Sequence, residues 1–599
     1  MGALVVTGAP VCYAQQRSEE WLPVTATDWQ VKEVPGDPGA AAIQLYYADF
    51  RDDTRQYQFI YRRIKILVDT GRSYANVEIP VPSQYSISGI QARTIHPDGH
   101  IVDFAGKPID KTLLRTRDSR IVAKELVLPQ ATAGSIVEYK YRLEWDKYLY
   151  DPTWPLQHDL YTVKESFWLK PYEGHIRTRY LSDDTRLSYV YSNLPAGVKP
   201  KETASGIELE AQGVPSFRGE NYMPPEDNYR SEVRFFYGGR EIESPEIFWR
   251  DTGKLWFGNA ERFIGNHPEI RSAAITLIGS ETDPEGKLRR LYARAQQVRN
   301  LSYERERTRA EERKEALKAN ESALDVLLHD YGSRNEIAEL FAALARAAGF
   351  HAELLRASSR QEKIFDPKLL SEAQLGIEIV RIKSNGLDLF LDPGTEFCPF
   401  GLVPWMYTSV PALKLARDGG DFILIPTPTA DKNVTRRTAT LTLDQGGSAN
   451  GQITLEFKGN TALQHRLNAL DTDEAGNRAR LEAELKEMLP ENCSIQFHDV
   501  EGIDRSEGSL IVHFSAAFPA LAAPAGRRLL LPASVFQSKQ LEAFRSSERR
   551  YPVYFPFGYE EIDQVKIQVP QGYAAEGLPA GQDVKLTSTR FITTRAAKS

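Results

Sequence analysis

The spacing of hydrophobic positions changes twice along the chain. Between residues 20 and 240, segments such as 56–68 and 133–145 alternate apolar and polar positions and are rich in β-branched and aromatic residues, which is typical of strands. From about residue 246 the apolar positions recur at helical spacing, and from about residue 430 the strand pattern returns. The pattern therefore predicts a central region with helices between two β regions.

The clearest helix is predicted within residues 331–349. Its apolar positions share one face: Ile337, Leu340, Phe341, Leu344 and Ala348. Ser333 is suited to the N-cap, Glu336 three residues later completes a capping box, and Gly349 is suited to end the helix. Downstream, residues 374–382 and 387–393 read as two strands joined by a turn at 384–386. This order predicts a buried helix followed by a β-hairpin.

The same segment resembles the nucleophile helix of the transglutaminase-like superfamily. In that family a Gly-x-Cys turn opens a helix that ends in Arg-Ala-Ala-Gly, and here the turn glycine is Gly332 and the ending is residues 346–349. The cysteine position of the family falls at Arg334. The resemblance also implies a histidine on the next strand and an aspartate on the strand after it. Those positions fall at Ile377 and at Asp392, which precedes a proline as in the family.

The substituted positions change the chemistry that the resemblance implies. A cysteine at a helix N-terminus has a lowered pKa and acts as a thiolate, whereas arginine cannot attack a carbonyl. Because a catalytic triad works as a unit, Asp392 alone cannot provide activity. The degenerate positions Arg334, Ile377 and Asp392 therefore predict no catalysis. We expect Arg334 either to pair with Asp392, with Glu378 as a second candidate neighbour, or to lie in solvent without a partner.

The two β regions carry weaker resemblances. The turn at residues 97–99 and the strand at 134–139 resemble the domain of unknown function that precedes a transglutaminase-like core in many exported bacterial proteins, and residues 550–559 resemble their C-terminal β domain. The expected fold class is α+β, with a transglutaminase-like (papain-like) core flanked by two mainly antiparallel β-sandwich domains. The expected division is a signal-peptide remnant at 1–14 and domains at 15–240, 241–428 and 429–599.

Composition and charge narrow the class of partner. The chain has 41% hydrophobic and 26% charged residues, as a globular protein does, and its net charge of -7 argues against a nucleic-acid or acidic-membrane partner. Residues 1–14 are apolar and resemble the end of a secretory signal peptide, so we expect a periplasmic or secreted protein. No other apolar run approaches the ~20 residues of a membrane span.

The cysteines and two histidines are the remaining candidates for chemistry. Cys398 is the only thiol between residues 241 and 428, but it precedes a proline in an apolar loop, which favours a buried structural cysteine over a displaced nucleophile. A disulfide between Cys398 and Cys493 stays open. His96 and His100 flank a Pro-Asp-Gly turn, which favours two turn histidines over metal ligands. We expect no cofactor and no metal.

Three functions remain open at this point. The first is a catalytically inactive transglutaminase-like protein of the bacterial cell envelope that serves as a binding or scaffolding module. The second is an active cysteine-type protease or transamidase with a displaced nucleophile. The third is a glycan- or protein-binding protein that acts through its β domains. The expected partner is an envelope protein, peptide or glycan.

Overall fold

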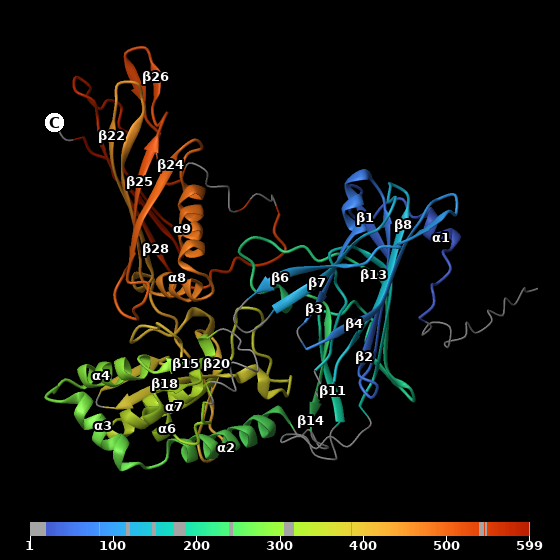
Figure 1. The fold of residues 1–599 in the computed structure, drawn as a ribbon, viewed down its shortest axis with the longest axis horizontal. Helices are drawn as coiled ribbons and strands as arrows, with labels where there is room; N and C mark the ends of the chain where they lie inside the picture. Colours follow the sequence, from blue (N-terminus) through green and yellow to red (C-terminus); the bar gives the residue numbers. More distant parts are fainter. Residues whose placement is uncertain are drawn as a thin grey trace, which may run out of the picture.

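A computed structural model describes residues 19–82, 84–115, 120–146, 151–172, 186–238, 244–304, 315, 317–384, 386–532, 534–537, 544 and 548–597. The expected leader at 1–14 lies outside these residues. The described chain is α+β and rich in strands. Figure 1 shows a helical centre, an N-terminal group of sheets beside it and a C-terminal sheet standing above it. The change of hydrophobic spacing along the sequence is therefore matched by a change of architecture.

The N-terminal region is built on an eight-stranded sheet. Its strands, in spatial order, are β12 (Lys201–Thr203), β13 (Gly206–Val214), β10 (Thr162–Lys170), β1 (Ala42–Asp52), β2 (Tyr57–Ile66), β8 (Ile136–Glu144), β4 (Ser86–Ile95) and β5 (Ile101–Asp103). Neighbours are antiparallel except β1 and β10, which are parallel. The short helix α1 (Ala26–Gln30) precedes β1. The predicted turn joins β4 to β5, and the N–H of His96 donates to the carbonyl of His100 at 2.8 Å across it.

Two three-stranded sheets pack on this large sheet. One contains β3 (Asn76–Val81), β7 (Arg120–Val127) and β6 (Ile109–Arg115), and the other contains β11 (Arg186–Ser192), β14 (Glu232–Gly238) and β9 (Thr153–Pro155). The first buries Ile79 and Leu126 against β2, β4 and β8. The second buries Trp154 and Phe235 against β1, β10 and β13. Because β1 is buried along its whole length, both of its faces are covered. The layered β architecture expected here is present, with one parallel pair.

The central region packs helices on an antiparallel sheet. The helices are α2 (Pro245–Ile264), α3 (Pro268–Ile278), α4 (Pro284–Gln296), α6 (Ala323–His329) and α7 (Arg334–Ala347). The sheet order is β19 (Leu387–Leu391), β18 (Ile377–Ser384), β17 (Ala352–Ala357), β20 (Pro411–Lys414) and β21 (Phe422–Leu424). Helix α7 contacts β17 and β18 on one side and the other four helices around it. The predicted helix and hairpin are therefore confirmed, and α7 is the centre of this core.

The C-terminal region is one five-stranded sheet covered by helices. Its order is β24 (Ser494–Glu501), β25 (Leu510–Phe518), β23 (Ala449–Phe457), β22 (Val434–Leu443) and β28 (Glu560–Gln568). Helices α8 (Asn460–Leu470) and α9 (Glu474–Met488) follow β23, and Leu481 and Leu485 of α9 pack on the sheet. Two hairpins, β26 (Ala523–Ala525) with β27 (Arg528–Leu530) and β29 (Gln582–Lys585) with β30 (Arg590–Thr593), complete it.

The C-terminal region differs from the sandwich expected for residues 429–599. The buried positions of β22, β23 and β25 lie on one face of the sheet, and the leucines of α9 cover that face. A helix that buries leucines on one side satisfies the same need for burial as a second sheet would. Alternation along the strands predicts a half-buried sheet correctly, but it does not say which kind of element covers it.

A segment that we call the strap, residues 548–559, precedes β28 of the C-terminal region and contacts the other two regions (Figure 1). The N–H of Tyr554 donates to the carbonyl of Tyr222 in the N-terminal region at 2.6 Å. Arg360, which follows β17, donates to the Tyr554 hydroxyl and to the carbonyl of Pro556, the latter at 2.6 Å. The strap therefore links all three regions through hydrogen bonds.

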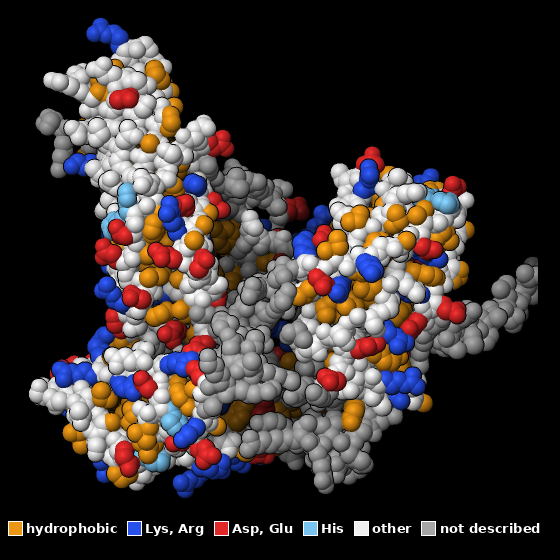
Figure 2. Space-filling view, viewed as in Figure 1, with side chains coloured by type: hydrophobic (Ala, Val, Ile, Leu, Met, Phe, Trp, Pro, Cys, Tyr) orange, Lys and Arg blue, Asp and Glu red, His pale blue; other side chains and the backbone are white. Residues whose placement is uncertain are grey.

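The surface is mixed in charge. On the face shown in Figure 2, acidic and basic side chains of the described residues are interspersed over all three regions. This distribution agrees with the small excess of acidic over basic residues. In the described part of the chain, no helix is both long enough and apolar enough to cross a membrane.

Candidate functional site

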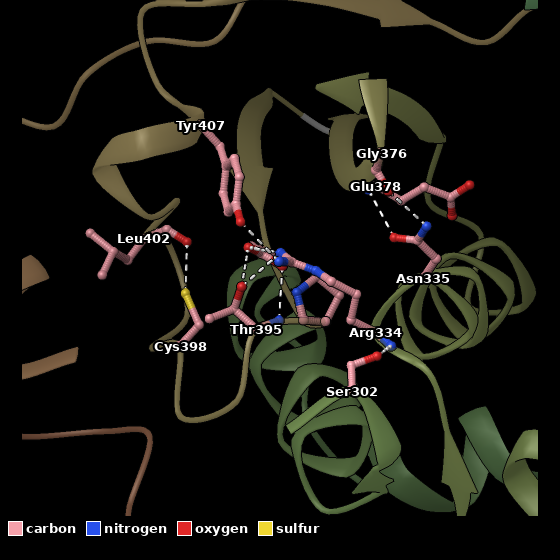
Figure 3. A network of polar contacts seen from close by, with 12 residues as sticks. Ser302, Arg334, Asn335, Gly376, Glu378, Thr395, Cys398, Leu402 and Tyr407 are labelled. Atoms are coloured by element: carbon pink, nitrogen blue, oxygen red, sulfur yellow. Dashed lines mark hydrogen bonds and ion pairs between the residues drawn. The ribbon is translucent and has the colours of Figure 1, made fainter. Parts of the chain in front are cut away.

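The first turn of α7 is fixed by its cap. The Ser333 side chain accepts from the N–H of Glu336, and the Glu336 carboxylate accepts from the N–H of Ser333 at 2.7 Å, which completes the predicted capping box. The N–H of Arg334 donates to the Ser302 hydroxyl at 3.0 Å (Figure 3). Arg334 is thus the first residue of the helix, at the positive end of the helix dipole.

The Arg334 side chain folds inward onto three oxygen atoms (Figure 3). Its Nη2 lies 2.8 Å from Oδ2 of Asp392 and 2.7 Å from Oγ1 of Thr395, and its Nη1 donates to the Tyr407 hydroxyl at 3.1 Å. The Arg334 side chain is 12% exposed and that of Asp392 is completely buried. The predicted ion pair between Arg334 and Asp392 is confirmed, and the alternative of a solvated arginine is wrong.

The loop after β19 holds Asp392 in place. Thr395 donates to the carboxylate twice, from its N–H to Oδ1 at 3.0 Å and from its hydroxyl to Oδ2 at 2.6 Å. The Tyr292 hydroxyl on α4 donates to the backbone carbonyl of Asp392 at 2.8 Å. At Gly394 a Cβ atom would lie 2.2 Å from the carbonyl oxygen of Arg334, so only glycine allows this loop to contact α7.

The electrostatics of this group favour a permanent positive charge. Burial by itself lowers the pKa of Arg334, but the Asp392 carboxylate and the hydroxyls of Tyr407 and Tyr303 raise it, and the result lies above the ordinary value for arginine. Burial also raises the pKa of Tyr303 to about 12, so its hydroxyl stays protonated at neutral pH. The group therefore holds a permanent cation beside the protonated hydroxyl of Tyr303, and a guanidinium cannot act as a nucleophile.

Ile377, the predicted base position, is the first residue of β18. It packs against an apolar cluster that contains Leu355, Ile379 and Tyr407. An aliphatic side chain can neither accept nor donate a proton, so this position contributes packing around Tyr407. That Arg334, Ile377 and Asp392 correspond to the triad of the superfamily stays a prediction.

Glu378, which we expected as a second neighbour of Arg334, pairs with a different arginine. Its carboxylate Oε1 lies 2.8 Å from Nη2 of Arg356 on β17, and its N–H donates to the Asn335 side chain at 3.1 Å. The strand register explains the correction, because Arg356 lies directly opposite Glu378 in the antiparallel pair. The contact with Arg356 is an ion pair, and neither carboxylate oxygen of Glu378 has a partner in hydrogen-bond geometry among the described residues.

Glu339 joins this second charge cluster from α7. Burial, together with the charge of Glu378, raises the pKa of Glu339 to about 9, and burial also raises the pKa of Glu378. The Arg356 guanidinium lies 5.1 Å from the centre of the Trp256 ring. Our sequence reasoning missed this cluster. The sequence did carry a signal for it, because Glu339 directly precedes the apolar positions Leu340 and Phe341 of a helix predicted to be buried.

Cys398 has the surroundings of a structural thiol. Its side chain is fully buried, its Sγ lies 3.3 Å from the carbonyl oxygen of Leu402, and its N–H donates to the carbonyl of Thr395 at 3.1 Å (Figure 3). Burial raises the pKa of the thiol well above its ordinary value. The thiol therefore stays protonated, and it forms no disulfide with Cys493. These features match the structural role that the sequence favours.

Two family models match parts of the N-terminal and C-terminal regions. Residues 52–197 match the family model for a domain of unknown function with solved structure, DUF3857, and residues 527–596 match the one for DUF3858. A search of curated proteins gives no match. Among solved structures, the chain is similar to a proposed protease from Parabacteroides distasonis, with 12% identity, 80% of this chain and 93% of that chain covered, and a TM-score of 0.43.

Proposed function

We propose that this chain is a catalytically inactive transglutaminase-like protein that acts as a binding or scaffolding module of the bacterial cell envelope. The observation that carries the proposal is the Arg334 guanidinium at the first turn of α7, where it donates to Asp392, Thr395 and Tyr407. An acyl-transfer enzyme of this type needs a thiolate at that helix terminus. The arginine takes the place of the thiolate and neutralises the carboxylate that would orient a base.

The arrangement around α7 supports a transglutaminase-like core. The N-terminus of a buried helix lies against an antiparallel sheet, and the aspartate follows the strand that pairs with β18. The Thr395 hydroxyl donates its proton to the Asp392 carboxylate and accepts from Arg334, so its proton and one lone pair are both engaged. The oxygen atoms near Asp392 are therefore occupied by structural hydrogen bonds.

Assays with the full chain test catalytic silence. We expect no incorporation of a primary amine into glutamine-containing protein and no amide hydrolysis by the wild-type chain. The double variant Arg334→Cys with Ile377→His should also be inactive, because the surrounding side chains remain arranged for a guanidinium. Activity of the wild-type chain that disappears in Cys398→Ala would overturn the proposal in favour of a displaced nucleophile. Melting curves recorded in parallel exclude unfolding as the cause of any loss.

Export and scaffolding have their own test. The apolar residues 1–14 motivate export, so protein isolated from its native host should begin close to Gln15 when analysed by mass spectrometry. Intact Met1 on cytoplasmic protein contradicts export.

After cross-linking in envelope extract, a scaffold should capture the same envelope protein, peptide or glycan in the wild-type chain and in Cys398→Ala. Capture that requires the thiol would contradict a non-catalytic role.

A further inference from the structure

A cluster of possible metal ligands lies far from α7, on the C-terminal sheet. It consists of Asp499 and Glu501 on β24 and His513 on β25, and one ligand atom from each lies within 4.8 Å of the other two. The Nε2 atom of His513 is 3.4 Å from Oε1 of Glu501 and 4.0 Å from Oδ1 of Asp499. Within the described residues, this is the one group of three such side chains at that spacing.

A β-bulge brings the three side chains to the same face. The register of β24 and β25 shifts between Phe497 and Asp499, so that His498 is the extra residue and Asp499 lies opposite His513. Residues beside the cluster, Val512 among them, point into the core, so the three ligands point away from it. Bulges of this kind commonly re-aim side chains near functional sites.

The orientation of His513 is set by a third strand. Thr454 on β23 lies opposite His513 in the sheet, and its hydroxyl lies 3.3 Å from Nδ1 of the imidazole. When Nδ1 is engaged in this way, Nε2 is the nitrogen that faces both carboxylates. Histidines that bind metals usually have their second nitrogen held by a hydrogen bond, which fixes the ring and the tautomer. Thr454 fits that supporting role.

We propose that Asp499, Glu501 and His513 form a binding site for Zn²⁺. Imidazole with carboxylates is a donor set that suits zinc, whereas calcium and magnesium prefer oxygen ligands alone. With metal–ligand bonds of about 2.0–2.2 Å, the donors of a tetrahedral site lie roughly 3.3–3.6 Å apart. The separations from Nε2, 3.4 Å to Glu501 and 4.0 Å to Asp499, are close to that spacing. Three protein ligands leave the fourth position open to water.

The same geometry also suits an ion pair without metal, in which protonated His513 lies between two carboxylates. The two arrangements differ in their response to zinc, because a metal site binds Zn²⁺ through neutral imidazole and competes with protons. An ion pair alone would give no saturable binding that depends on these residues. A zinc titration of the folded protein therefore decides between them.

Isothermal titration of the metal-free full chain with Zn²⁺ at pH 7.5 tests the site. We expect saturable binding of one equivalent that His513→Gln and Asp499→Asn each weaken by at least about 10-fold, and that lowering the pH to 5.5 also weakens. Thr454→Ala should weaken binding by roughly 10-fold, and Thr454→Ser should restore it, because serine keeps the hydroxyl.

The matched control is His498→Gln, which removes an exposed histidine from the same bulge without removing a proposed ligand. We expect unchanged zinc binding in this variant. Melting curves without zinc should agree for all variants, since the substituted side chains lie on the outer face. Absence of saturable binding below about 1 mM, or equal binding by wild type and His513→Gln, would overturn the proposal.

Discussion

Two buried charge clusters flank the first half of α7, and they satisfy their charges in different ways. In the first, the Arg334 guanidinium meets one carboxylate and also donates to the hydroxyls of Thr395 and Tyr407, while its Nε has no partner among the described residues. In the second, one guanidinium faces two buried carboxyl groups, those of Glu339 and Glu378. Matched charges stay ionised when they are buried. An excess carboxyl group instead binds a proton, which lowers the free-energy cost of burying it.

The comparison separates two consequences of burying charge. A matched and hydrogen-bonded pair is costly to break, because the partner that remains is a buried charge without compensation. An unmatched carboxyl group makes stability depend on pH, since its pKa differs between the folded and unfolded states. The predictions below test this distinction, from the largest expected effect to the smallest.

The first prediction breaks the matched cluster. Arg334→Ala should lower the free energy of unfolding by about 3–5 kcal/mol, because the fully buried Asp392 carboxylate loses its cation. Urea or thermal unfolding of the full chain measures this loss. The control is Arg262→Ala, which removes an exposed arginine from α2 and should change stability by less than about 0.5 kcal/mol. An Arg334→Ala melt that equals wild type would contradict the matched-pair interpretation.

The second prediction concerns the unmatched cluster and pH. A carboxyl group whose pKa is raised to about 9 by folding binds a proton more tightly in the folded state, so the protein loses stability as pH rises from the unfolded pKa toward the folded one. Relative to wild type, the free energy of unfolding of Glu339→Gln should therefore increase by about 2–4 kcal/mol as the pH rises from 5 to 8.

Unfolding curves at several pH values measure this gain. Glu285→Gln, which alters a half-buried glutamate on α4 that pairs with Arg289, is the control and should follow the wild-type pH dependence. If Glu339→Gln also follows the wild-type dependence, Glu339 is not the group that takes up the proton.

The third prediction measures the coupling within the matched cluster. Removing both charges, in Arg334→Met with Asp392→Asn, should cost about 1–3 kcal/mol less than the sum of the two single substitutions, because no buried charge is left alone. A double-mutant cycle from urea unfolding gives this value. Additive costs would mean that the two side chains stabilise the core independently.

The smallest effect is expected at Cys398. Replacing this buried thiol with alanine removes only one atom from the core, so Cys398→Ala should lower stability by about 1 kcal/mol. A thiol reagent should leave Cys398 unmodified in the folded protein and modify it in urea, as peptide mapping would reveal. Rapid modification of the native protein at Cys398 would mean that the thiol is exposed and ionised.

The matched pair was predicted through the resemblance to the transglutaminase-like superfamily, which implies that the two positions lie close together, and short motifs located each position in the sequence. The capping box fixes where α7 begins, and the Asp-Pro pair ends β19, so both partners of the ion pair are identifiable from short motifs. The unmatched cluster depends on the register of β17 with β18, which neither strand reveals alone.

Helix α8 was missed for another reason. Much of its buried side is polar, including His465 and Arg466, so apolar spacing does not mark it.

Contacts that are distant in sequence were also beyond prediction. The parallel pairing of β1 with β10 joins strands separated by most of the N-terminal region, and no pattern within either strand specifies it. The helices covering the C-terminal sheet replace an expected second sheet for a similar reason. Hydrophobic spacing indicates which face of an element is buried, whereas partners depend on the whole chain.

The strap gives the order of synthesis a structural consequence. Val434 on β22 lies opposite Glu560 on β28, so the C-terminal sheet gains its last strand only after almost the whole chain has left the ribosome. The strap immediately precedes β28 and binds both Tyr222 and Arg360. The chain between β22 and β28 must close as one long loop, which is slow. The pairing of β28 and the docking of the three regions should therefore occur together, as a late step of folding. Until then β22 remains an open sheet edge, which is where a nascent chain would need protection from aggregation.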